Sequence, residues 1–222
     1  KDVCTRWEAV RRIRTVFTIH NIEYQGRYGA DTVDQLFGLD RGWYNDGTLQ
    51  MDGDVNLMKG AMLVSDAVTT VSPTYAAQLH DAAYAEGMEG VVRMIDGKFS
   101  GVVNGLDVAG YDPAHDPALP ENYDVEGKAA CKASLQASLG LAQEPDTPLM
   151  GIVSRLVGHK GLDIVEQGLD GIMATGCQLV VLGQGESQFE DAFRWAQNRW
   201  PGRVSAQITY SDNLSRRIYG AA

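Results

Sequence analysis

The stretch MGIVSRLVGHKGLDIV, residues 150–165, decides the fold of this chain. Its apolar run ends at Ser154, which predicts the end of a buried strand, and helical spacing of apolar residues begins after Lys160. Arg155 follows the strand directly, so two cations flank a strand-to-helix turn. Such a pair can hold an anion at the N-terminus of the helix, or it can be two solvated charges of an ordinary surface loop.

The same strand-and-helix alternation continues to residue 222. Apolar runs predict strands at 148–154, 177–183 and 203–209, and helical spacing predicts helices at 160–175, 186–199 and 212–222. This order predicts parallel strands joined by right-handed crossovers. The last third of the chain is therefore expected to be an α/β unit with a parallel sheet.

The first half of the chain has a similar but less regular pattern. Strands are expected at 14–21, 66–71 and 98–104, and helices at 54–65, 72–79 and 88–95. The first 14 residues have the pattern of a helix, and a long polar, glycine-containing loop is expected between residues 22 and 53. Residues 110–126 are rich in proline and acids and mark a boundary. Asp107, just before this segment, and Asp112 and Asp116 within it are expected to be solvated. A helix is expected at 125–141, ended by Gly140.

The composition limits the classes of ligand. The chain has 222 residues, 44% of them hydrophobic, and a net charge of −10, so we expect no nucleic-acid partner. Its apolar runs are shorter than the roughly 18 residues that a membrane span needs, and no signal peptide opens it, so we expect no membrane partner. Three dispersed cysteines, Cys4, Cys131 and Cys177, are typical of buried filler in a cytoplasmic protein. No histidine or cysteine set has zinc-ligand spacing.

Chemically informative residues follow several of the predicted strands. Ligands of parallel sheets bind beyond the carboxyl ends of the strands, and the residues found there are His20, Asn104, Arg155, Gly183, Gly185 and Tyr210. Each also has a plain interpretation: a hydrogen-bonded structural histidine, turn residues at Asn104 and at the two glycines, and an edge-packing aromatic at Tyr210. Their common position favours a binding site over any one of these interpretations.

Seven stretches of the chain together resemble the bacterial glycogen synthases and plant starch synthases. They include VFTIHNIEYQG and GIVSRLVGHKGLDIV, they occur in the family's order, and they occupy residues 16–26, 56–79, 87–93, 97–107, 151–165, 178–186 and 208–222. The family consists of retaining glycosyltransferases of the GT-B architecture. The resemblance implies the back part of an N-terminal, acceptor-side Rossmann-like domain at 1–109, a crossover and helix at 110–147, and the front part of a C-terminal, nucleotide-sugar-binding domain at 148–222.

The resemblance also implies a reaction. Glucose would pass from ADP-glucose to the non-reducing end of an α-1,4-glucan with retention of configuration, with no cofactor and no metal. Arg155 and Lys160 match the pair that holds the donor diphosphate, and His20 matches the histidine that contacts the transferred sugar. Asn104 matches a residue near the donor sugar. Gly183 and Gly185 match the loop near the nucleotide, and Tyr210 matches the aromatic against the adenine.

Two motifs of the family, Lys-Thr-Gly-Gly-Leu and Glu-Pro-Cys-Gly-Leu, are not found in these 222 residues. The expectation is therefore an internal fragment of a synthase, active as the full-length protein and inactive alone, with exposed sheet edges. Two alternatives stay open: a truncated piece that at most binds ADP or glucan, and a UDP-sugar-dependent transferase of the same architecture.

Overall fold

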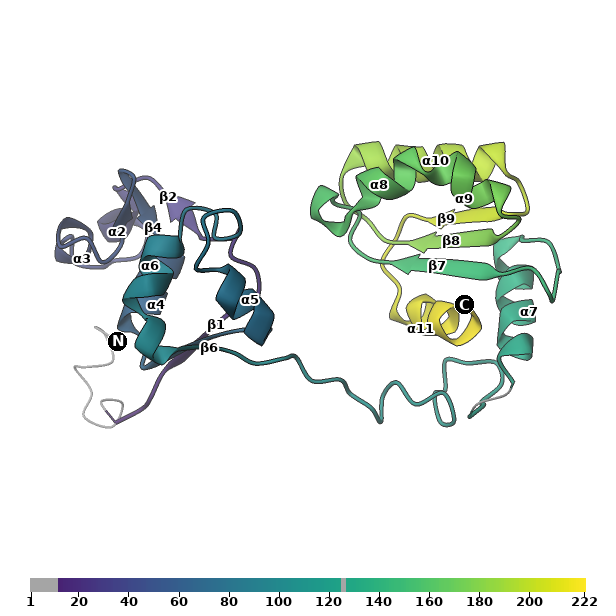
Figure 1. The fold of residues 1–222 in the computed structure, drawn as a ribbon, viewed down its shortest axis with the longest axis horizontal. Coiled ribbons are helices and arrows are strands. Elements are labelled where there is room, and N and C mark those ends of the chain that lie inside the picture. The colour runs from purple at the N-terminus through teal and green to yellow at the C-terminus, as the bar shows by residue number, and fades with distance from the viewer. Residues whose placement is uncertain (1–11, 125–126) are drawn as a thin grey trace. The chain divides into compact units, whose positions relative to one another are not determined.

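The computed structural model describes residues 12–124 and 127–222 (Figure 1). The chain divides after Leu106 into two compact units, each with a parallel sheet and its own core. Cys4 and residues 1–11 of the helix expected at the N-terminus lie outside the described residues, and residues 12–14 are not helical.

The first unit is built on a three-stranded parallel sheet. It contains β1 (Val16–Ile19), β5 (Ala67–Thr70) and β6 (Phe99–Gly101) in the order β1-β5-β6. The Asp66 carboxylate accepts hydrogen bonds from the Thr15 backbone N–H (2.8 Å) and hydroxyl (3.0 Å), which ties the starts of β1 and β5 together. The three expected strands are confirmed, each shorter than its apolar run.

Three helices enclose the core of this unit: α4 (Leu57–Val64), α5 (Pro73–Gln78) and α6 (Glu89–Met94). The Ser72 hydroxyl accepts a hydrogen bond from the Tyr75 N–H (3.3 Å) and Pro73 opens α5, as the sequence predicts. A short 3-10 turn, η2 (Asp96–Lys98), precedes β6. The core contains fully buried side chains from both layers, among them Met62, Val68, Leu79, Met88 and Val92.

The polar loop expected between residues 22 and 53 is partly wrong. It contains an antiparallel sheet of order β2-β4-β3, formed by β2 (Arg27–Tyr28), β3 (Gln50–Met51) and β4 (Asp54–Asn56), with the short helices α2 (Thr32–Gln35) and α3 (Gly42–Asn45). These strands are too short to produce a readable alternation, and they form because Val33, Leu49 and Val55 pack together. For the same reason the helix expected from residue 54 begins at Leu57.

The second unit is a parallel sheet with helices on both faces. Its strands β7 (Leu149–Val153), β8 (Gln178–Leu182) and β9 (Val204–Gln207) have the order β7-β8-β9. Every residue of the central strand β8 is buried. Leu179 and Val181 pack into one core and Val180 and Leu182 into another, because successive side chains of a strand point to opposite faces.

The helices of the second unit separate into two layers (Figure 1). Helices α8 (Leu162–Gln167), α9 (Leu169–Ala174) and α10 (Ser187–Arg199) cover one face, and α7 (Lys128–Leu139) and α11 (Asp212–Ala221) cover the other. Gly140, at φ +68°, ends α7 as expected. The single helix expected at 160–175 is instead a 3-10 turn, η3 (Gly158–Lys160), followed by two short helices, because Gly161 is left-handed (φ +71°) and the chain breaks again at Gly168.

Three further findings concern both units of the described chain. Within residues 12–124 and 127–222, β1, β6, β7 and β9 each pair on one side only. Cys131 and Cys177 are buried free thiols, in agreement with their expected role as filler. Among the described helices, none combines the length and the apolarity that a membrane crossing requires.

Candidate functional site

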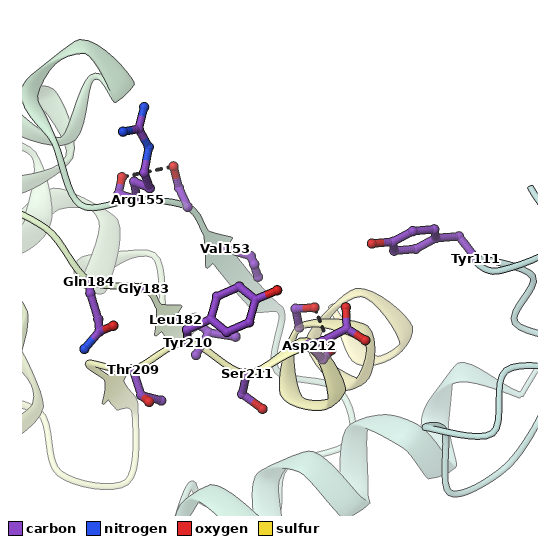
Figure 2. A pocket seen from close by; sticks show the side chains of 12 residues that line it. Tyr111, Val153, Arg155, Leu182, Gly183, Gln184, Thr209, Tyr210, Ser211 and Asp212 are labelled. Carbon is purple, nitrogen blue, oxygen red and sulfur yellow. Dashed lines mark hydrogen bonds between the residues drawn. The ribbon is translucent and has the colours of Figure 1, made fainter. Parts of the chain in front are cut away.

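A pocket of about 490 Å³ lies beyond the carboxyl ends of β7 and β8, where the fold is expected to bind ligands (Figure 2). Three loops build it, and its lining residues are 153–155, 182–184 and 209–212 together with Tyr111 and Ser215. All of these residues belong to the second unit.

Two glycines let the loops after β7 and β8 run side by side. A Cβ atom on Gly183 would lie 1.8 Å from the Ser154 carbonyl oxygen, and one on Gly185 would lie 2.1 Å from the Leu156 carbonyl oxygen. Neither glycine has a positive φ, so the close approach of the two backbones, and not a tight turn, requires glycine at both positions. Hydrogen bonds from the Leu156 N–H to the Gln184 carbonyl (2.9 Å) and from the Glu186 N–H to the Leu156 carbonyl (2.7 Å) hold the loops together.

The backbone N–H groups of both glycines are already used within the protein. That of Gly183 donates to the Gln207 carbonyl (3.1 Å), and that of Gly185 donates to the Glu190 carboxylate (3.0 Å). An anion in this pocket must therefore be held by other groups than these two amides.

Arg155 and Lys160 occupy different places in the same loop. Arg155 is exposed and lines the pocket directly after β7 (Figure 2). Lys160 is exposed at the end of η3 and is not a lining residue. The Gly158 N–H donates to the Glu186 carboxylate (3.2 Å), which ties the turn that carries Lys160 to the loop after β8. The structure therefore places one cation in the pocket and the second within the same strand-to-helix turn.

Tyr210 supplies an aromatic ring to the pocket from the loop after β9. It is 85% exposed, which is unusual for a side chain of this size and leaves the ring open to a planar ligand. The next residue, Ser211, caps α11 by accepting a hydrogen bond from the Leu214 N–H (3.2 Å). The first turn of α11, with Asp212 and Ser215, therefore completes this wall of the pocket.

Tyr111 contributes a second aromatic ring from the segment before α7, with its hydroxyl directed toward the pocket (Figure 2). The Arg216 guanidinium lies 4.6 Å from the centroid of this ring. Arg216 also donates hydrogen bonds to Asp212 (3.0 Å), Asp116 (3.1 Å) and the Gly110 carbonyl. The hydrogen bond to Asp212, followed by that to Asp116, raises the pKa of Arg216. This clamp fastens the segment that carries Tyr111 to α11.

The clamp corrects one expectation about the acidic boundary segment. Asp116 is 6% exposed and pairs with Arg216, so it is not a solvated charge. Asp107 is exposed, as expected. The pKa of Asp112 is lowered by a hydrogen bond with His115 and, to a lesser extent, by one from the Ala114 N–H.

His20 and Asn104 belong to the first unit and follow β1 and β6, whose carboxyl ends meet at one edge of its sheet. Both side chains are exposed. The loop after His20 is held by a buried network, in which the Asn56 amide donates to the Gln25 side-chain oxygen (2.7 Å) and Gln25 donates to the Glu86 carbonyl (2.9 Å). This network fixes the path of the chain as it leaves β1.

Comparison with known proteins shows which enzymes the chain is similar to. Residues 1–94 match the family model of the starch synthase catalytic domain. The glycogen synthase of Streptococcus uberis is 45% identical over 218 residues, which cover 97% of this chain and 46% of that protein. The glycogen synthase of Streptococcus equi subsp. zooepidemicus is 46% identical over 217 residues, which cover 96% of this chain and 46% of that protein. Over nearly its whole length, the chain is similar to glycogen and starch synthases. It spans about half the length of these curated relatives.

A solved structure of the family agrees with the fold. The catalytic domain of Starch Synthase IV from Arabidopsis thaliana, bound to ADP and acarbose, matches with a TM-score of 0.89 and 32% identity, over 96% of this chain and 45% of that one. The two parallel α/β units of the present chain are thus of the GT-B type, as the resemblance implied.

Sequence reasoning missed several lining residues of the pocket. Tyr111, Ser211, Asp212 and Ser215 were not among the expected site residues. Ser211 directly follows Tyr210, so its position beyond a strand end could have indicated it. Tyr111 had no such signal, because it precedes β7 in the chain by about one helix and two loops. Within the described residues, no group of three or more His, Cys, Asp or Glu side chains is arranged to hold a metal ion.

Proposed function

We propose that the protein is a glycogen synthase that transfers glucose from ADP-glucose to the non-reducing end of an α-1,4-glucan, with retention of configuration and release of ADP. The observation that carries this proposal is the pocket beyond β7 and β8, which combines Arg155 with the open ring of Tyr210. The names of the relatives, and the ADP bound in the Arabidopsis structure, support the same assignment.

The charges of the pocket suit a departing diphosphate. Cleavage of the bond between glucose and the diphosphate leaves negative charge on the leaving group, and fixed cations stabilise that charge in the transition state. The planar guanidinium of Arg155 can hold two phosphate oxygens at once, whereas Lys160 acts as a point charge on a flexible four-carbon stem. We assign the two residues these roles. ADP-glucose is itself the activated donor, so the proposed reaction needs no cofactor.

The aromatic residues suit the nucleoside. We assign Tyr210 to stacking on the adenine ring, because its ring is open in the pocket. We assign the Gly183 and Gly185 loop, whose glycines let it run against the loop after β7, to the nucleotide side of the pocket. His20 and Asn104, at one sheet edge of the first unit, are assigned to the transferred sugar. We further propose a cytoplasmic location, which the buried free thiols Cys131 and Cys177 support.

The decisive experiment is glucosyl transfer to glycogen by the full-length protein, with 14C-labelled ADP-glucose and UDP-glucose compared as donors. Incorporation from ADP-glucose well above that from UDP-glucose is expected. Equal or greater incorporation from UDP-glucose would identify a UDP-sugar transferase, and no incorporation by folded protein would refute the proposed activity. The 222-residue chain is assayed in parallel, because ADP binding without transfer would mark this part as a binding unit.

A further inference from the structure

A second concave surface lies on the helical layer of the second unit. It is a groove of about 410 Å³ between α8–α9 and α10, and it shares no lining residue with the nucleotide pocket. Gln188, Asp191 and Trp195 line it from α10. These positions are three, four and seven residues apart and therefore share one face of the helix, separate from the face that buries Phe189, Phe193 and Ala196.

Trp195 is a preorganised aromatic platform at this groove. Its side chain is 54% exposed, yet its ring is held against Trp200 in an edge-to-face contact at 5.7 Å and 85°. The Arg199 guanidinium lies 5.6 Å from the centroid of Trp195 and 5.3 Å from that of Trp200, and it is 3.8 Å from the Asp170 carboxylate across the groove. A side chain already held in place loses little conformational entropy when a ligand stacks on it.

The other groups of the groove define the chemistry of a ligand. Its polar lining consists of carboxylates and carboxamides, with Asp170 and Gln167 on one side and Asp191 and Gln188 on the other. Negative charge disfavours phosphates and nucleic acids. Carboxylates instead accept hydrogen bonds from hydroxyl groups, and carboxamides both accept hydrogen bonds from hydroxyl groups and donate to them. A neutral ring with an apolar face and hydroxyl groups around its rim fits both the platform and its surroundings.

We propose that this groove is a second carbohydrate site, in which Trp195 stacks on a glucose unit of an α-1,4-glucan chain. The choice of glucan rests on the proposed function, since that polymer is the proposed acceptor. The groove and the nucleotide pocket belong to the same unit, so glucan held in the groove raises the effective concentration of chain ends near the donor. The site retains the enzyme on its polymer between successive transfers.

The test is the retention of the protein in native gels that contain glycogen, without any nucleotide, together with titration with maltoheptaose. Trp195→Ala is expected to weaken the apparent affinity about tenfold, the scale of losing a central tryptophan from a binding surface. Tyr84→Ala is the matched control, because Tyr84 is a similarly exposed aromatic (51%) in the first unit, and it should bind as the unmodified protein does. Gln188→Ala, which keeps both tryptophans, should weaken binding to a smaller extent.

Each outcome bears on the proposal. Unchanged retention in Trp195→Ala, or no retention of the unmodified protein, would overturn it. Loss of a dimer in sedimentation of Trp195→Ala would also overturn it, because the face would then be a contact between two copies. If Gln188→Ala and Trp195→Ala unfold at the same temperature as the unmodified protein, a folding defect is excluded as the cause of weaker binding. A further result is that the protein fails to transfer glucose from ADP-glucose while its retention in glycogen-containing gels still depends on Trp195. That result would refute the proposed function and leave the groove proposal standing.

Discussion

Arg155 is the side chain on which the proposed chemistry depends most. It is exposed and lines the pocket directly after β7, where a diphosphate would meet the carboxyl end of that strand. Tyr210 is 85% exposed in the same pocket. At the residue scale, the proposed chemistry therefore rests on exposed side chains at strand ends.

Replacing Arg155 with alanine should lower kcat of the full-length enzyme about 10²- to 10³-fold, the usual effect of losing one group that stabilises transition-state charge. The kcat of Arg155→Lys should lie between those of the unmodified enzyme and Arg155→Ala, because lysine keeps the positive charge and loses the bidentate geometry of the guanidinium. Arg41→Ala is the control, since Arg41 pairs with Asp31 and Asp34 on the surface of the first unit. Near-normal kcat in Arg155→Ala would exclude the leaving-group role.

His20→Ala should impair glucosyl transfer and leave thermal unfolding nearly unchanged. The side chain is exposed after β1, and exposed substitutions change stability by about 0.5 kcal/mol or less. His115→Ala, at an 81% exposed side chain, is the control for activity. A large fall in the unfolding temperature of His20→Ala would instead show that the histidine is structural.

At the scale of elements, the pocket depends on how closely two loops and one helix approach one another. The loops after β7 and β8 touch through Gly183 and Gly185, and α11 holds the segment that carries Tyr111. Neither contact is a property of one strand or helix alone. The pocket wall therefore depends on contacts between the elements that build it.

Gly183→Ala should destabilise the second unit by about 1–3 kcal/mol, because the new methyl group would overlap the Ser154 carbonyl and force the loops apart. ADP affinity should fall with it. Gly158→Ala is a control in the adjoining turn, where a Cβ atom meets nothing within 4 Å. Urea unfolding and calorimetric ADP titration measure the two effects, and equal stability of both variants would contradict the steric argument.

Asp116→Asn should destabilise the clamp by about 1–3 kcal/mol, since it places an amide donor or a weaker acceptor against the Arg216 guanidinium in a buried position. The variant should also weaken ADP binding, because the Tyr111 segment is no longer fastened to α11. Asp146→Asn, at an exposed position, should change neither quantity. Unchanged ADP affinity in a destabilised Asp116→Asn would show that Tyr111 is not part of the binding wall.

At the scale of the molecule, the two units have separate cores and separate sheets. Each core is closed by its own helices, so each unit can respond to a ligand by itself. Trp43 reports on the first unit, and Trp195 and Trp200 report on the second.

ADP should therefore raise the stability of the second unit selectively. At 100 times its dissociation constant, a ligand that binds only the folded state adds about 2.7 kcal/mol. Calorimetry with and without ADP is expected to resolve two transitions and to move one of them. Comparing the fluorescence-detected unfolding of Trp43→Phe with that of the unmodified protein identifies the transition of the first unit, because the substitution removes the signal of Trp43. A single unfolding transition, or an equal shift of both transitions by ADP, would contradict the expectation that the two units respond to the ligand separately.

Most of the fold was predictable, because the evidence for it is local. The apolar run of β8 and the helical spacing of α10 are contained within a few residues each, and Ser72 and Gly140 mark helix ends through their own side chain or lack of one. The sheet of β2, β3 and β4 was not predictable, because strands of two or three residues carry no periodicity. The break at Gly168 was hidden by apolar spacing that continues across it.

The sequence by itself determined the parallel α/β architecture, the resemblance to glycogen and starch synthases, and the position of Arg155 and Tyr210 at strand ends, since each follows from short-range pattern and motif. Only the tertiary structure decided that Tyr111 lines the pocket and that Asp116 is buried against Arg216, 100 residues away. Contacts of that range depend on how α11 packs against the boundary segment. No local pattern encodes that packing, because it results from the burial of a whole helix face.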